Sequence, residues 1–255
     1  MGWALFASHF YRRLWKNEAV IVVFHRVNDA YPHDPITCSS TVFEAYVRFF
    51  ARYFEVLSLT ELLNRLESGG DLTRTLVITF DDGYQGNATR AAPILEEHGL
   101  RACFFVTTSF IGSTYVPWWD RNQNIESEWM TWDQVRQLRA AGHEIGSHTV
   151  SHVNLGSTVG DDARREIGGG MKRLLAELGE DSGLFAYPFG GVKNMAAENQ
   201  PILKELGLRC CVSAYGGTVR KGDDPYRLRR ITVSNWLLSP YHFGFELVAR
   251  RLDKE

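Results

Sequence analysis

Cysteine is scarce in this chain of 255 residues, and the few cysteines present form no recognisable pattern. They are Cys38, Cys103, Cys210 and Cys211, without a Cys-x-x-Cys spacing. This scarcity argues against a disulfide-stabilised scaffold and against a cysteine-ligated metal site. A reducing compartment is therefore permitted.

Long apolar runs and an excess of one charge are also missing. No run approaches the ~18 apolar residues that suggest a membrane-spanning helix. The net charge is −2, whereas a nucleic-acid-binding surface is normally basic, so nucleic acid is not expected as a partner. The sequence also lacks internal repeats, low-complexity segments and linkers. Its length and its 44% apolar composition suit one α/β domain with a sizeable core.

The N-terminal residues 2–17 have aromatic side chains at helical spacing and basic side chains on the other side. This pattern predicts an amphipathic helix over residues 1–18, ahead of a domain over residues 19–255. The helix either packs on the domain or makes a peripheral membrane contact. No small-residue cleavage site follows a purely apolar core, so no signal peptide is recognised. The expected location is the cytoplasm or the cytoplasmic face of the membrane.

Predicted strands and helices alternate along most of the chain, which indicates parallel βαβ units. Strands are expected at 19–24, 55–57, 76–80, 102–106, 143–146, 184–187, 209–213 and 227–233, and helices at 41–54, 60–67, 85–98, 131–141, 158–179 and 196–206. Three consecutive glycines, residues 168–170, predict a kink or break in the helix over 158–179. Residues 111–128 read as a long polar loop, and a loop of this length in a small domain is often functional.

The strand over 76–80 ends in Asp81-Asp82-Gly83, two adjacent carboxylates followed by a turn residue. Successive strand side chains point to opposite faces, so adjacent carboxylates make a poor acid–base pair unless the strand has begun to turn. A division of labour is more plausible, in which one aspartate binds a metal and the other handles protons. The alternative is an ordinary strand that ends in an Asp-Gly turn.

A second stretch carries residues suited to a metal site, and a third is weaker. His148 and His152 are four positions apart and would share one face of a helix or tight turn. With one aspartate they would make a two-histidine, one-carboxylate site that leaves coordination positions for water and substrate. The segment 186–190, Ala-Tyr-Pro-Phe-Gly, is ordinary turn chemistry when taken alone.

In this order the three stretches resemble the motifs of the polysaccharide deacetylases that share the NodB homology domain, carbohydrate esterase family 4. The resemblance runs from about residue 20 to about residue 235. It implies an α/β fold of a distorted (β/α)7-type barrel, a single domain, and hydrolysis of N-acetyl groups on a glycan.

The resemblance also implies the roles of individual residues. The metal ligands would be Asp82, His148 and His152, and the general base would be Asp81. The backbone N–H of Phe189 would stabilise the oxyanion. The implied cofactor is a divalent metal, with zinc expected and cobalt, nickel or iron as alternatives.

Two departures from the family pattern need other residues to fill the roles. The third motif usually carries an arginine where this chain has Ala186, and Arg230 is the expected replacement. The alternative is that Arg230 is a surface charge beside a strand. The usual late Leu-x-His motif is missing. Phe24-His25-Arg26-Val27 is similar to a circularly permuted subgroup that includes poly-N-acetylglucosamine deacetylases, so His25 is expected to be the general acid.

Substrate contacts are expected from Tyr187, Trp118 and Trp119. The two tryptophans suit stacking on sugar rings but could equally fill the barrel.

A second hypothesis for the function is a domain that holds glycan without cutting it. An iron oxygenase would normally carry His-x-Asp with a distant histidine, and this order of residues differs. A glycosidase needs two carboxylates that face each other across the bond, which adjacent Asp81 and Asp82 cannot readily do.

Overall fold

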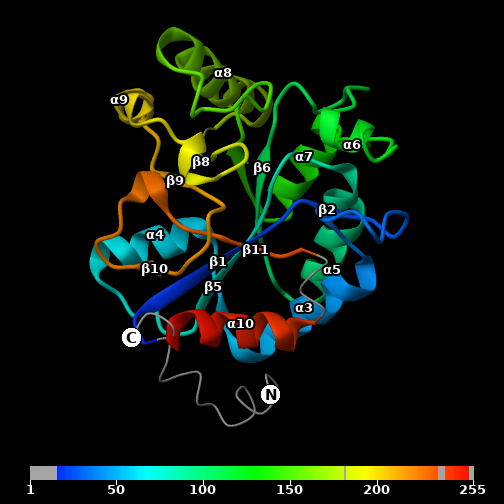
Figure 1. Cartoon of the computed structure of the whole chain (residues 1–255), viewed down its shortest axis with the longest axis vertical. Coiled ribbons are helices and arrows are strands. Elements are labelled where there is room, and N and C mark those ends of the chain that lie inside the picture. The colour runs from blue at the N-terminus through cyan, green and yellow to red at the C-terminus, as the bar shows by residue number, and fades with distance from the viewer. Residues whose placement is uncertain (1–15, 181, 235–238, 253–255) are drawn as a thin grey trace.

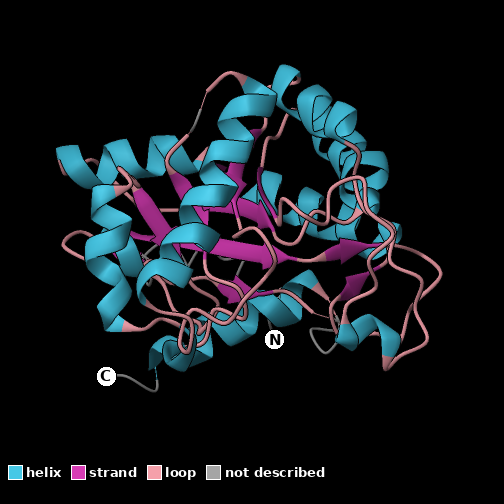
Figure 2. Ribbon diagram, turned by 90° about the horizontal axis from the view of Figure 1, so that it is seen from above, coloured by secondary structure: helices cyan, strands magenta, loops and turns pink. Residues whose placement is uncertain are grey.

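A curled sheet forms the centre of the molecule, and helices surround it (Figures 1 and 2). The computed structural model describes residues 16–180, 182–234 and 239–252. Most of the predicted N-terminal helix, with its proposed membrane contact, lies outside these residues. The described part contains no helix long and apolar enough to cross a membrane.

The strands follow the order β10-β1-β5-β6-β7-β8-β9, with β4 beside β5 and β11 beside β1. Their bounds are β1 Glu18–Phe24, β4 Glu55–Val56, β5 Thr75–Phe80, β6 Cys103–Val106, β7 Glu144–Ser147, β8 Leu184–Ala186, β9 Cys210–Val212, β10 Val219–Arg220 and β11 Ile231–Thr232. The neighbours from β1 to β9 pair in parallel, as alternating strands and helices require. A separate parallel pair joins β2 (Arg26–Val27) and β3 (Thr37–Cys38).

Helices surround this sheet (Figure 2). They are α3 Ser40–Tyr53, α4 Leu59–Ser68, α5 Ala92–Glu97, α6 Trp118–Arg121, α7 Trp132–Ala140, α8 Gly160–Leu178, α9 Gln200–Glu205 and α10 Pro240–Leu252, with a π-helical turn at Asn87–Ala91 and 3₁₀ turns at Val192–Asn194, Ala197–Asn199 and Pro225–Arg227. Val20 and Val22 of β1 belong to the apolar cluster packed with α3, α5 and α10, and Ile21 belongs to a second cluster on the other face. Strands with both faces buried are therefore continuous apolar runs.

The segment over residues 228–233 closes the curled sheet. Leu228 makes a bridge to Val212 of β9, and β11 pairs in parallel with β1. The Val233 N–H donates to the Val23 carbonyl oxygen at 2.9 Å. The segment thus lies between the two ends of the sheet, and Arg230, within it, is completely buried.

Three predictions of secondary structure were wrong. The helix over 158–179 runs as α8 without a break, despite its glycines. The loop over 111–128 contains the short helix α6, and the strand predicted at 227–233 is reduced to β11. The helix α10 was not predicted; it packs its Phe243 and Leu247 into the cluster with α3. The predicted fold class, a single α/β domain with a barrel-like sheet, is confirmed.

Candidate active site and metal centre

The two motif aspartates point in different directions because the chain turns between them. Asp81 still follows the strand, and its N–H donates to the Phe24 carbonyl oxygen of β1 at 3.0 Å. Asp82 has a φ of 72°, in the left-handed region. This turn at the carboxyl end of β5 removes the geometric objection to two adjacent functional carboxylates.

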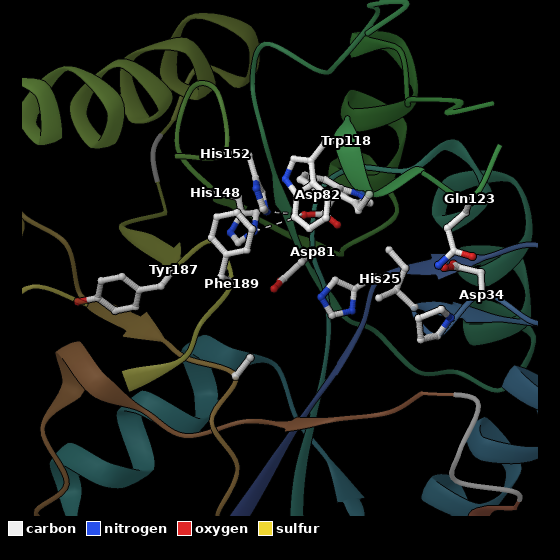
Figure 3. A pocket seen from close by; sticks show the side chains of 14 residues that line it. His25, Asp34, Asp81, Asp82, Trp118, Gln123, His148, His152, Tyr187 and Phe189 are labelled. Atoms are coloured by element: carbon white, nitrogen blue, oxygen red, sulfur yellow. Dashed lines mark ion pairs between the residues drawn. The ribbon is translucent and has the colours of Figure 1, made fainter. Parts of the chain in front are cut away.

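Asp82 faces both motif histidines (Figure 3). Its Oδ1 lies 3.4 Å from Nε2 of His148 and 3.2 Å from Nε2 of His152. In the described part of the chain, these three residues each offer a ligand atom, and the three atoms lie within 4.8 Å of one another. The segment between the histidines is neither helix nor strand, so a tight turn, rather than a helix face, brings them together.

The hydrogen bonds around this group fit a bound cation. His148 Nδ1 lies 2.8 Å from the Ala186 carbonyl oxygen, which accepts its proton and leaves Nε2 as the free lone pair. Oδ1 of Asp82 is buried without a hydrogen-bond partner, although both imidazoles lie at ion-pair distance. A carboxylate oxygen and two imidazole nitrogens that converge in this way are a suitable donor set for a divalent metal.

Asp81 is held by Arg230 rather than by the histidines. The guanidinium donates from Nη1 to Oδ1 at 2.7 Å and from Nη2 to Oδ2 at 2.6 Å. Its other donors reach the Ser213 carbonyl oxygen at 2.5 Å and the Thr79 hydroxyl at 3.0 Å. A bidentate arginine–carboxylate pair of this kind is strong and fixes the orientation of both groups. Arg230 is thus no surface charge.

Both carboxylates are ionised at neutral pH. Burial alone would raise the pKa of Asp81, but Arg230 and His148 outweigh burial and lower the pKa below its ordinary value. For Asp82, burial acts in the same direction, and the two imidazoles hold its pKa well below the ordinary range. The site therefore offers one anionic ligand and one anionic proton acceptor.

His25 and Phe189 lie on the rim of the same pocket (Figure 3). His25 follows β1 directly, and its Nδ1 is buried without a hydrogen-bond partner. Phe189 has a φ of 63° and exposes 46% of its surface, with its ring 4.7 Å from that of His152. No described residue accepts a hydrogen bond from the Phe189 N–H, which leaves this donor available to a ligand.

The three side chains predicted to contact substrate point in different directions. Trp118 exposes 58% of its surface beside the pocket, whereas Trp119 packs its ring 4.8 Å from His152. Neither tryptophan fills the barrel interior. Tyr187 borders the pocket, but its ring points away into the cluster under α8 and α9, and its hydroxyl donates to the Tyr226 carbonyl oxygen. The geometry therefore gives Tyr187 no substrate contact through its ring.

Sequence reasoning missed a buried network on the tryptophan side. Arg26 donates to Asp34 at 2.7 Å and to both oxygens of Asp120, at 2.9 and 3.1 Å. The Tyr84 hydroxyl also donates to Asp120, and Trp119 Nε1 donates to that hydroxyl. Arg26 and Tyr84 are next to recognised motifs, but no spacing in the sequence relates either of them to Asp34 or Asp120. Asp34, Pro35, Ile36, Gln123 and Ala214 also line the pocket and were not predicted.

Several known proteins are similar in sequence to this chain. The chain is 24% identical over 240 residues to the poly-β-1,6-N-acetyl-D-glucosamine N-deacetylase of Staphylococcus epidermidis, covering 86% of this chain and 80% of that one. It is 26% identical over 136 residues to the peptidoglycan-N-acetylmuramic acid deacetylase PdaA of Bacillus subtilis, covering 53% and 45%. The chain spans about half or less of the length of several of its curated relatives.

The fold has a close match among solved structures. The Streptococcus pyogenes deacetylase PplD in complex with acetate superposes with a TM-score of 0.77, at 20% identity, over 89% of this chain and 96% of that one. The family model described as polysaccharide deacetylase matches residues 69–211, which include both motif aspartates and both motif histidines. This chain is accordingly a member of the polysaccharide deacetylase family, in agreement with the predicted resemblance.

Proposed function

We propose that this protein is a metal-dependent hydrolase that removes N-acetyl groups from an amino-sugar polysaccharide or glycoconjugate. One observation carries the proposal. The two adjacent carboxylates are separated in role, with Asp82 turned toward two imidazoles and Asp81 bound to Arg230 at the floor of the same pocket. Amide hydrolysis by activated water needs this division between metal ligand and proton acceptor.

The proposed metal ligands are Asp82, His148 and His152. When bound, a divalent ion lowers the pKa of its water from 15.7 toward ~7 and polarises the amide carbonyl. Zinc is the ion we propose, and cobalt, nickel and iron are alternatives that suit the same nitrogen and oxygen donors.

The remaining steps are proton transfers by this chain's own residues. Asp81 would accept the proton of the attacking water, because each of its oxygens keeps a lone pair beyond the one bound by Arg230. The Phe189 N–H would stabilise the oxyanion that develops as the new C–O bond forms. Protonated His25 would donate to the amine nitrogen as the C–N bond breaks, which balances the proton taken up by Asp81.

The exposed ring of Trp118 would stack on a sugar, since aromatic faces suit the apolar faces of pyranose rings. By their names, the relatives act on N-acetylmuramic acid in peptidoglycan and on poly-β-1,6-N-acetyl-D-glucosamine. Both are N-acetylated glycans, and this class is the substrate we propose.

Acetate release tests the proposal. The purified protein is loaded with zinc and incubated with acetylated chito-oligomers, poly-N-acetylglucosamine and peptidoglycan, with and without a chelator. We expect acetate from at least one glycan and none after chelation. Asp81→Asn should keep stoichiometric metal but lose at least ~100-fold in rate, because it removes the general base. Unchanged turnover in that variant would exclude Asp81 from the mechanism.

A glycan-binding domain without activity is the competing hypothesis, and it rests on the altered third motif and on the reassignment of the general acid to His25. Arg230 makes the pair with Asp81 that the usual arginine of the third motif would make, which supports the enzyme over the binding domain. Glycan binding without acetate release, by metal-loaded protein, would reverse this preference.

A further inference from the structure

The turn that joins the two histidines of the metal centre has an unusual backbone. Thr149 and His152 have φ values of 67° and 59°, in the left-handed region that non-glycine residues seldom adopt. Such conformations cost of order 1–3 kcal/mol each and persist only where the surroundings enforce them. Since both imidazoles must face Asp82, whatever holds this turn also sets the geometry of the ligands.

The side chain of Glu166, in the first half of α8, accepts hydrogen bonds from this turn. Its Oε2 accepts from the N–H of Val150 at 3.1 Å and from the N–H of Ser151 at 2.9 Å. Its Oε1 accepts from the Ser151 hydroxyl at 2.8 Å. One carboxylate thus binds the two residues that directly precede His152.

The turn is also closed from within and from the helix backbone. The His152 N–H donates to the Thr149 hydroxyl at 2.9 Å. The Val150 N–H also lies 3.1 Å from the Glu166 carbonyl oxygen. The N–H groups of Val150, Ser151 and His152 are therefore all occupied, and Glu166 accepts from the first two.

The consecutive glycines of α8 allow this helix to lie close to the turn between the two histidines. A Cβ on Gly169 would lie 2.8 Å from Cγ2 of Val150, and one on Gly170 would lie 2.4 Å from the Ser147 hydroxyl. Side chains at these positions would push the helix away from the turn. The glycines thus permit close contact between α8 and the turn, which explains why they do not break the helix.

We propose that Glu166 is a positioning residue for the metal centre: it fixes Val150 and Ser151 so that both imidazoles face Asp82, and thereby sets the affinity for the metal. The proposal rests on the proposed function, because it assumes that Asp82, His148 and His152 bind a metal. Removal of a residue that orients metal ligands typically lowers the affinity for the metal about 10–100-fold.

The test is the dissociation constant for zinc, measured by competition with a chelating dye. Glu166→Ala should weaken binding by about 10–100-fold. Glu166→Gln should stay within about 3-fold, because its amide oxygen can accept from both N–H groups while its NH₂ donates to Ser151. Asp162→Ala is the matched control, since Asp162 is an exposed acid of the same helix that forms an ion pair with Arg165.

The outcomes separate this inference from the proposed function. If the unmodified protein binds no zinc, the proposed metal site fails. If it binds zinc and Glu166→Ala binds equally well, or if Asp162→Ala weakens binding as much, only the role of Glu166 is overturned. A purely structural role would lower the melting temperature of the metal-free protein without changing the dissociation constant.

A second variant covers the case in which Glu166→Ala does not fold. Gly169→Ala places a methyl group against Val150 and displaces the turn from the helix side. We expect weaker zinc binding by several-fold, with Glu166 intact. An unchanged dissociation constant in this variant would contradict the proposal.

Discussion

At the scale of single residues, the proposed base depends on a partner 149 positions away in the chain. Arg230 is completely buried and makes four hydrogen bonds, two of them to Asp81. A buried carboxylate without such a partner would be neutral, because burial disfavours its charged form. The ability of Asp81 to accept a proton is therefore a property of the pair.

Arg230→Met should remove this partner and leave a buried carboxylate uncompensated. We expect the free energy of unfolding to fall by about 3–5 kcal/mol, as for other broken buried ion pairs. Urea denaturation measures the change. Arg229→Met is the matched control, because the neighbouring Arg229 is partly exposed and its pair with Asp223 should contribute less than about 1 kcal/mol. Equal losses in both variants would contradict the special role of Arg230.

At the scale of elements, the pocket has a wall that the barrel itself does not build. The helix α6 with Trp118 and Trp119 forms this wall together with the segment 34–36. Asp120 joins the wall to β2 through its ion pair with Arg26, and both side chains are almost fully buried. The substrate contact proposed for Trp118 would therefore depend on this ion pair.

Asp120→Ala should detach the wall while leaving the proposed metal ligands and Asp81 in place. We expect KM to rise by about 10-fold and kcat to stay within about 3-fold. This is the pattern seen when a variant binds the substrate and the transition state equally less tightly. Steady-state kinetics on the glycan identified by acetate release give both constants. Asp133→Ala, at an exposed acid of α7, should change neither. A fall in kcat without a change in KM would place Asp120 with the reacting groups instead.

The elements that the sequence predicts well are those whose pattern is local. The parallel strands are continuous apolar runs. The helix predicted from residue 41 is α3, which starts one residue earlier, after its N-cap Ser39, whose side chain accepts from the Val42 N–H. The features that the sequence did not predict depend on tertiary contacts. Gly169 and Gly170 of α8 lie against the segment that carries the two histidines, and α10 is ordered by its packing on α3. Arg230 could be proposed only from a family resemblance, since no local spacing relates it to Asp81.

At the scale of the whole molecule, the site joins parts of the chain that are distant in sequence. Asp82 follows β5, the two histidines follow β7, and His25 follows β1, so the carboxyl ends of several parallel strands meet at one pocket. A ligand that binds three such residues can bind only the folded chain. Its binding free energy therefore adds to the stability of the whole fold.

Metal binding should accordingly be visible in the melting temperature. At zinc concentrations about 100 times the dissociation constant, the folded state gains about 2.7 kcal/mol, which corresponds to roughly 5–10 °C for a domain of this size. We expect a chelator to remove this shift, and His148→Ala and His152→Ala to abolish it along with most of the bound metal in elemental analysis. His98→Ala, at a histidine outside the pocket, and Asp81→Asn should both retain the shift. A zinc-dependent shift that survives in both motif-histidine variants would place the metal elsewhere in the chain, and the assignment of Asp82, His148 and His152 as its ligands would be wrong.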